Sequence, residues 1–338
     1  MSLDPDRQRQ LHSLKLRALA RDVLNIDITD VTGTPDGAIA TDGSVVVALA
    51  ENRPERGLGA ALAAAQRQGL DTMYVFATGA TDVLSRRASL FGATATIWEI
   101  QGRSANRVVA VGMPIEEQPR PQVSRDILDL LDGAFVDVVV EHGILVGEVE
   151  GLEVARVIDD EHGQRLEVGV GAHDREAFAM LHGGLPPSAA LRKVVDVVRL
   201  HRTPGADPHP LNRLGAERWL RSRIIERPDV VGATVLAPAS PPVQRISLKE
   251  PVPAVAVGSE ADGTAVVLVV STGIDLDLVP FAADARLKLA PDARLVVAVP
   301  ERDAHPITRG LINDVLGDVS IVAIDNDWRN WSAPEPVV

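Results

Sequence analysis

The sequence predicts an α/β protein in which two related α/β modules flank a β-rich middle segment. The first observation is a repeat: apolar runs separated by helical stretches recur in the same order near both ends of the chain. The runs lie at 45–50, 73–77 and 93–100 in the first module and at 265–270, 295–299 and 319–324 in the second. The second observation is a pair of proline-rich stretches, 114–122 and 203–210, which are typical of linkers. They predict domains at 1–118, 119–205 and 206–338.

The first module is predicted to run helix, β-meander, helix, strand, helix, strand. Leucines and valines recur at helical spacing over 5–24, which predicts the first helix. The turn signals Pro35-Asp36-Gly37 and Asp42-Gly43 separate the three strands of the meander. These strands are predicted at 26–31, 38–41 and 44–50, and the next helix at about 55–69. A second helix is expected between the strands at 73–77 and 93–100.

The middle segment is predicted to contain four strands and three helices. Glycines and polar turn residues separate apolar runs at 135–140, 144–149, 154–158 and 166–170, and helical patterns cover 124–131, 173–182 and 187–201. The last module should begin with a helix over 211–225. The tail after Asp325 carries Trp328 and Trp331 and is predicted to be a loop or a docking strip.

The composition excludes several classes of protein and of functional site. The chain has 338 residues, of which 46% are hydrophobic but only 3% aromatic, so its cores must consist mainly of valine, leucine and alanine. It has no cysteine, which excludes disulfides, thiolate zinc sites and cysteine nucleophiles. The first residues have mixed charge and no apolar run approaches the roughly 18 residues of a membrane span, so we expect no signal peptide, no membrane association and a cytoplasmic location. The net charge of −13 argues against a surface that coats nucleic acid, although a local basic groove remains compatible with it.

A short motif lies in the first module. Pro35-Asp36 is followed about 15 residues later by Glu51-Asn52-Arg53. With the predicted order of elements over 5–100, this resembles the restriction-endonuclease-like PD-(D/E)XK superfamily. The resemblance implies that Asp36, Glu51 and Arg53 occupy catalytic positions, with Arg53 where the superfamily has lysine. It also implies that Asp36 and Glu51 bind Mg²⁺ or Mn²⁺ and that nucleic acid is a partner.

The chemistry of such a site is clear. Two carboxylates at the ends of adjacent strands can share a hard divalent cation, which polarises a phosphoryl oxygen and lowers the pKa of a bound water. Arg53 can supply positive charge, but it stays protonated and cannot act as a base, so we expect slow or absent hydrolysis. The structural alternative is that Asp36 belongs to an ordinary Pro-Asp-Gly turn and that Glu51 stabilises the start of the following helix.

The second module lacks this motif. Its equivalent strand, 266–270, is followed by Ser271-Thr272-Gly273, with no acid-x-base pair. Asp275 and Asp277 lie just beyond it and are expected at the start of a helix.

Three further segments have both a functional and a structural interpretation. His173, Asp174 and Glu176, with His182 downstream, could bind a metal or perform acid–base catalysis, but they are equally typical of a helix start, which we favour. Gly57-Leu58-Gly59 suggests a nucleotide loop but lacks the third glycine, since Leu62 stands there. The third segment is basic and contains a tryptophan; its residues are Arg199, His201, Arg202, Arg213, Arg218, Trp219, Arg221 and Arg223. It is either an anion or nucleic-acid contact or a solvated face that pairs with nearby acids.

Three hypotheses for function follow. The chain is a nuclease-like protein, active or degenerate, in nucleic-acid metabolism. Alternatively, it is a non-catalytic scaffold or binding protein whose duplicated modules form a pseudo-twofold body or a homodimer. In the third hypothesis it is a small-molecule enzyme that uses the region from His173 to Glu176.

Overall fold

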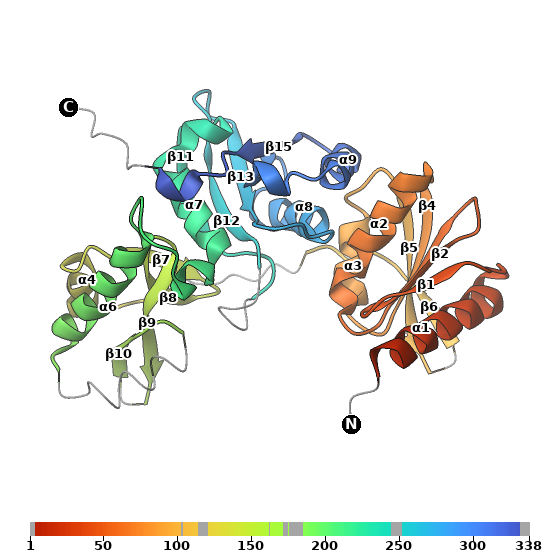
Figure 1. Ribbon diagram of the computed structural model, residues 1–338, viewed down its shortest axis with the longest axis horizontal. Coiled ribbons are helices and arrows are strands. Elements are labelled where there is room, and N and C mark those ends of the chain that lie inside the picture. The colour runs from red at the N-terminus through yellow and green to blue at the C-terminus, as the bar shows by residue number, and fades with distance from the viewer. Residues whose placement is uncertain are drawn as a thin grey trace. The chain divides into compact units, whose positions relative to one another are not determined.

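The repeated apolar runs of the sequence form the central strands of two separate sheets, and a third sheet lies between them in the chain (Figure 1). The computed structural model describes residues 4–102, 104–113, 121–161, 163–171, 175, 185–244 and 252–331. The predicted α/β class is confirmed. Contacts group the chain into two units. Unit 1 comprises Met1–Pro114, Ile274–Asp292 and Ala304–Ile321, and unit 2 comprises Ile115–Gly273, Ala293–Asp303 and Val322–Val338.

The first module starts with the predicted amphipathic helix. Helix α1 covers Pro5–Leu19 and continues as one π-helical turn, Ala20–Leu24, which ends where Asn25 takes a left-handed conformation. Proline in the first turn and Asp6 beside it both favour a helix start there. The helix buries Leu16 and Leu19 in a core that also contains the inner faces of the neighbouring strands.

Six strands follow in chain order across the first sheet. They are β1 (Val31–Gly33), β2 (Gly37–Thr41), β3 (Val46–Ala50), β4 (Thr72–Ala77), β5 (Thr94–Gln101) and β6 (Ser104–Val108). The first three form the predicted antiparallel meander, β3, β4 and β5 are parallel, and β6 returns antiparallel. Two helices, α2 (Gly57–Gln68) and α3 (Thr81–Ala88), connect the parallel strands. All five residues of β3 are buried, as expected for a central strand with both faces covered.

The first strand differs from its prediction. The alternating segment 26–30 has no regular structure, and β1 begins only at Val31. Ile28 is nevertheless buried in the core, and the carbonyl of Thr29 accepts a hydrogen bond from Arg17 at 2.8 Å. The alternation of apolar and polar residues over 26–30 therefore indicated which side chains are buried, but it did not indicate that the segment pairs with another strand.

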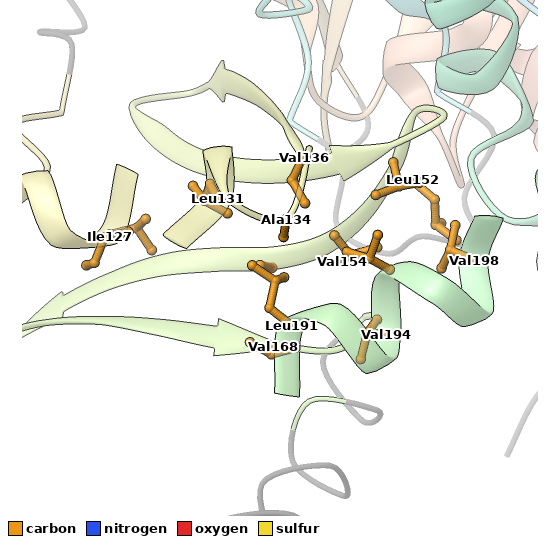
Figure 2. Close-up of a cluster of buried hydrophobic side chains, with 14 of the residues drawn as sticks. Ile127, Leu131, Ala134, Val136, Leu152, Val154, Val168, Leu191, Val194 and Val198 are labelled. Carbon is orange, nitrogen blue, oxygen red and sulfur yellow. The ribbon is translucent and has the colours of Figure 1, made fainter. Parts of the chain in front are cut away.

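The middle segment forms an antiparallel sheet with helices on one face. The elements are α4 (Arg125–Asp132), β7 (Asp137–Glu141), β8 (Ile144–Val149), β9 (Leu152–Asp160), β10 (Gly163–Val168) and α6 (Pro187–Arg202), with the strands in the order β10-β9-β8-β7. Leu131 of α4, Leu152 of β9, and Leu191 and Val198 of α6 are completely buried in one core (Figure 2). The predicted helix at 173–182, apart from Arg175, and most of the linker at 114–122 lie outside the described residues.

The second module repeats the strand order of the first. Its strands lie in the order β11 (Val235–Ala239), β12 (Ala254–Ser259), β13 (Ala265–Val270), β14 (Arg294–Pro300) and β15 (Val319–Ile324). The pairs β11–β12 and β12–β13 are antiparallel and β13–β14 is parallel, the succession also found from β1 to β4. Helix α7 (Ala216–Glu226) precedes the sheet, α8 (Leu278–Leu289) follows β13 and α9 (Pro306–Asp314) follows β14.

The end of the chain contributes to the core of unit 2. Trp328 is fully buried at the start of a 3₁₀ turn, and its ring meets that of Trp219 edge-on with 5.3 Å between the centroids. The tail was predicted to be a loop or a docking strip, but this part of it packs inside the protein. Among the described helices, none has the length and apolar character needed to cross a membrane.

Candidate functional site

The turn before β2 brings Asp36 and Glu51 to the same end of the first sheet. The antiparallel register pairs Gly37 with Ala50. The carbonyl of Asp36 accepts hydrogen bonds from the backbone N–H groups of Glu51 at 2.8 Å and Asn52 at 3.1 Å. The two acidic residues are therefore neighbours in the backbone, as the spacing of the motif predicts.

The side chain of Asp36 is occupied by Arg53. The Arg53 Nε atom lies 3.0 Å from Asp36 Oδ1, and Nη2 donates to Oδ2, so the guanidinium contacts both carboxylate oxygens. Both side chains remain partly exposed. The hydrogen bond to Asp36 raises the pKa of Arg53, which keeps that cation charged.

The side chain of Glu51 has two different partners, both on α1. Lys15 Nζ lies 2.6 Å from Glu51 Oε1, and His12 Nε2 lies 3.7 Å from Oε2. The other ring nitrogen of His12, Nδ1, lies 3.1 Å from the carbonyl of Thr34 and donates to it, so Nε2 can pair with Glu51 only when the ring carries a second proton. The motif did not indicate either residue. Their spacing of three on a helix was the available signal, because such residues share one face.

Each carboxylate of the motif is thus neutralised by its own cation. A divalent metal ion would have to displace Arg53 from Asp36 and Lys15 from Glu51. Within the described part of the chain, no group of three or more histidine, aspartate and glutamate side chains is placed to bind a metal ion. A separate cavity of about 420 Å³ in unit 1 is lined by Asp30, Thr32, Thr41, Arg67 and Gln68, among others, and not by Asp36, Glu51 or Arg53.

The glycines at the start of α2 have a packing role. A Cβ atom on Gly59 would lie 2.2 Å from the carbonyl oxygen of Leu276, and one on Gly57 would lie 2.3 Å from the Cβ of Ala50. Backbone and side chain approach α2 too closely at these positions for any larger residue. The two glycines therefore need no nucleotide to explain them.

Four arginines of the basic stretch are buried, which corrects both interpretations for these four, whereas Arg199 and Arg213 are exposed. Arg202, Arg218, Arg221 and Arg223 are each no more than 7% exposed, so they form neither a solvated face nor a surface for nucleic acid. Arg202 donates to the carbonyls of Glu150 at 2.6 Å and Leu211 at 3.0 Å, and also to that of Leu214. Burial lowers its pKa to about 9.

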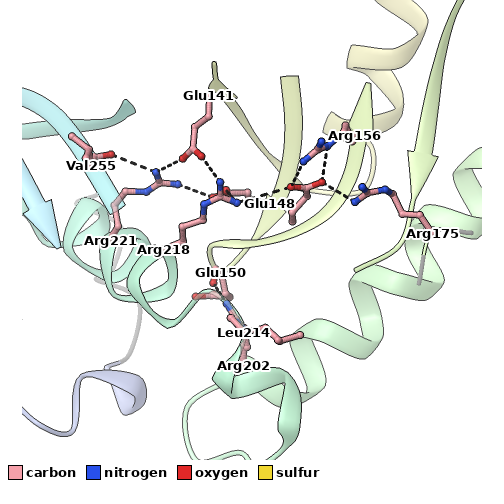
Figure 3. A network of polar contacts seen from close by, with 11 residues as sticks. Glu141, Glu148, Glu150, Arg156, Arg175, Arg202, Leu214, Arg218, Arg221 and Val255 are labelled. Atoms are coloured by element: carbon pink, nitrogen blue, oxygen red, sulfur yellow. Dashed lines mark hydrogen bonds and ion pairs between the residues drawn. The ribbon is translucent and has the colours of Figure 1, made fainter. Parts of the chain in front are cut away.

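Arg218 and Arg221 connect α7 to the middle sheet through buried glutamates (Figure 3). Arg221 Nη1 lies 2.8 Å from Glu141 Oε1, and Arg221 Nη2 lies 2.9 Å from Glu148 Oε2. Arg218 donates to Glu141 and approaches Glu148 Oε1 at 3.4 Å. Burial raises the pKa of Glu148, although both arginines act in the opposite direction. This network has a structural role.

The segment from His173 to Glu176 cannot be compared with its predictions, because His173, Asp174, Glu176 and His182 lie outside the described residues. Arg175, within that segment, is described. Its Nη1 atom lies 2.9 Å from Glu153 Oε1 and extends the buried network.

The acidic residues before α8 pair with arginines of the first module. Asp275 Oδ2 lies 2.6 Å from Arg56 Nη2, and Asp277, directly before α8, lies 3.0 Å from Arg87 Nη1. The predicted place at a helix start is confirmed for Asp277, and Asp275 lies two residues before it. Burial raises the pKa of Asp277 to about 6, while Arg87 opposes the shift.

This raised pKa predicts a pH effect on stability. The folded protein binds a proton at Asp277 more tightly than the unfolded chain, so the free energy of unfolding should fall as the pH rises from about 4 to 6. In the variant Asp277→Asn, the side chain at this position does not titrate. Relative to wild type, it should therefore be more stable at pH 7 than at pH 4, by on the order of 2–3 kcal/mol. Urea denaturation of both proteins at a series of pH values measures the difference, and a constant difference would contradict the burial argument.

Compared with known protein families, with curated proteins and with solved structures, the chain has no match. The superfamily resemblance therefore stays a prediction, and the interpretation of the site depends on its geometry.

Proposed function

We propose that the chain is a non-catalytic scaffold or binding protein built from two copies of one α/β module. The observation that carries this proposal is the reciprocal pairing of helices from the two modules within unit 1. Helices α2 and α8 each follow the third strand of their module, and α3 and α9 each follow the fourth. Helix α2 packs against α9, and α3 packs against α8. A twofold axis between two copies would produce this pattern, because the first helix of each copy then contacts the second helix of the other.

Backbone pairing supports the same twofold relation. Phe91, just after α3, forms an antiparallel bridge with Val315, just after α9. The N–H of Gly92 donates to the carbonyl of Asp314 at 2.8 Å, and the N–H of Leu316 donates to that of Leu90 at 2.9 Å. Segments at equivalent positions thus bond to each other reciprocally, as in the interface of a symmetric dimer. We propose that one chain supplies both halves of such a dimer by duplication.

Buried ion pairs connect α3 with α8. Arg86 of α3 makes a two-point contact with Asp284 of α8, at 2.8 and 3.2 Å, and Arg87 Nε lies 3.2 Å from the same carboxylate. Such pairs tolerate little displacement, because separation would leave charges buried without partners. A firmly paired set of helices within unit 1 suits a scaffold. We propose a cytoplasmic location for it.

The ion pairs of Asp36 and Glu51 support the non-catalytic assignment. Catalysis with Mg²⁺ or Mn²⁺ would need both carboxylates to be available to the metal. Arg53 occupies both oxygens of Asp36, and Lys15 and His12 contact the oxygens of Glu51.

A nuclease-like activity is the second candidate, and Lys15 favours it. The motif has Arg53 where the superfamily has lysine, and Lys15 places an ammonium group 2.6 Å from Glu51. In this alternative, Mg²⁺ or Mn²⁺ bound by Asp36 and Glu51 would displace the cations, and Lys15 would contact the attacking water or the phosphate of a nucleic acid.

A nuclease assay separates the two candidates. Single- and double-stranded DNA and RNA are incubated with Mg²⁺ or Mn²⁺ and wild type, Asp36→Ala, Glu51→Ala, Arg53→Lys or Lys15→Ala, with Asp42→Ala as a control acid in the neighbouring hairpin turn. We expect no hydrolysis above buffer by any of these proteins. Hydrolysis by wild type that disappears in the Asp36 and Glu51 variants, but not in Asp42→Ala, would instead establish the nuclease.

A further inference from the structure

A cavity of about 360 Å³ in unit 2 has no role in the function proposed above. Residues from the end of α6, the segment before α7, α7 itself and the last described turn line it. They include His201, His209, Asn212, Arg213, Trp219 and Arg329. Its volume lies within the range of roughly 300–1,000 Å³ that is usual for small-molecule sites.

Two lining residues have buried polar atoms that lack a partner. Trp219 is 2% exposed, and its Nε1 atom makes no hydrogen bond with any described residue. The Oδ1 atom of Asn212 is likewise buried and unbonded within the described part of the chain. Both atoms are closed off from solvent, so they belong to the packed wall of the cavity.

The charged side chains that line the cavity are two arginines and one aspartate, Arg213, Arg329 and Asp327. Arg213 is exposed, while Arg329 is partly buried, with its guanidinium 4.1 Å from the ring centroid of Trp328 and 5.5 Å from that of Trp219. Neither arginine forms an ion pair with a carboxylate of the described residues. The lining carboxylate Asp327 accepts a hydrogen bond from Asn330 at 2.5 Å. Burial, with Arg302 nearby, lowers the pKa of Arg329, while Asp303 and Glu217 act in the opposite direction; a bound anion would add to their effect.

The two histidines add a planar surface and a further donor. Their rings are parallel to within 7°, with 3.7 Å between the centroids. His209 Nδ1 accepts a hydrogen bond from the N–H of Leu211 at 3.3 Å, so the neutral ring carries its proton on Nε2. The donors that line the cavity are therefore two guanidinium groups and an imidazole N–H, beside the carboxylate of Asp327.

We infer that this cavity binds a phosphate group, either free or as the ester of a small organic molecule, through Arg213 and Arg329. Phosphate presents several acceptor oxygens, and the planar guanidinium fork matches two of them at once. The volume exceeds the needs of phosphate alone, so we expect the ester to bind more tightly, with its organic part beside the histidine and tryptophan rings. The inference is independent of the site at Asp36 and Glu51, because none of its residues belongs to that site.

Titration of the full chain with inorganic phosphate and with AMP tests the inference. Binding is followed by tryptophan fluorescence, which Trp219 and Trp328 should report, and by calorimetry. Wild type should bind AMP saturably. Arg329→Gln and Arg213→Gln should each weaken binding about tenfold or more, because each removes a charge-assisted contact. Arg125→Gln, which alters an exposed ion pair on α4, is the matched control and should bind as wild type does.

The outcomes are distinct. Tighter binding of AMP than of phosphate identifies an ester as the ligand, whereas equal binding identifies free phosphate as sufficient. Arg213 is exposed, so its variant should fold even if the Arg329 variant does not. The inference is overturned if neither probe binds saturably, or if the folded Arg213→Gln protein binds both probes as wild type does.

Discussion

Replacing Arg221 with methionine should lower the free energy of unfolding by about 3–5 kcal/mol. Arg221 is 1% exposed, and its two terminal nitrogens contact Glu141 at 2.8 Å and Glu148 at 2.9 Å. Methionine has a similar length but no charge, so both carboxylates lose a buried cation. Burial already raises the pKa of Glu148, and without Arg221 its ionised form would be still less stable.

Chemical denaturation of full-length protein measures this effect. Arg125→Met is a matched control, because Arg125 forms an exposed pair with Asp129 and such pairs contribute about 1 kcal/mol or less. Adding Glu148→Gln to Arg221→Met should recover part of the loss, since one buried carboxylate is then removed with its partner while Glu141 keeps its contact with Arg218. A loss from Arg221→Met no larger than that of the control would show that the network does not stabilise unit 2.

The variant Arg87→Met should be destabilised to a similar degree, about 3–5 kcal/mol, in unit 1. Arg87 is 1% exposed and contacts Asp277 at 3.0 Å and Asp284 at 3.2 Å. It also donates to the carbonyl of Glu55 at 3.2 Å. Its removal leaves Asp277 without its arginine partner and Asp284 with Arg86 alone.

Two comparisons make this second result specific. Arg9→Met, which breaks an exposed pair with Asp6, should cost far less. The loss from Arg87→Met should also shrink as the pH falls below about 6, because Asp277 then takes up a proton and its charge disappears. Equal losses at pH 7 and pH 5 would argue that Arg87 acts through packing rather than through its charge.

Local patterns predicted most of the elements. The period of the leucines over 5–24 matches α1 and the π turn, and the apolar runs at 45–50, 265–270 and 295–299 coincide with buried parallel strands. These patterns are reliable because each depends on neighbours within one element. The strand expected at 26–31 failed for the same reason: alternation reports burial, whereas pairing needs a partner strand elsewhere in the chain.

For the candidate site, the sequence predicted where the backbone places the acidic residues, but it did not predict the partners of their side chains. The spacing of Asp36 and Glu51 around a hairpin placed them side by side, since a tight turn determines register. It could not identify Lys15 and His12 as the partners of Glu51, because both lie more than 30 residues earlier in the chain and reach Glu51 through tertiary packing.

The sequence by itself determined the α/β class, the matching order of strands in the two modules and the absence of thiol chemistry, because all three depend on residue type and short-range periodicity. Only the tertiary structure decided which charges are buried. The sequence predicted that the arginines of α7 are exposed at the surface. They are instead buried in unit 2, where they contact Glu141 and Glu148, which lie 70 to 80 residues away in the chain. Likewise, the cavity around Trp219 and Arg329 joins residues that are 110 positions apart. Charge pairing over such distances depends on how the elements pack, and no local pattern encodes it.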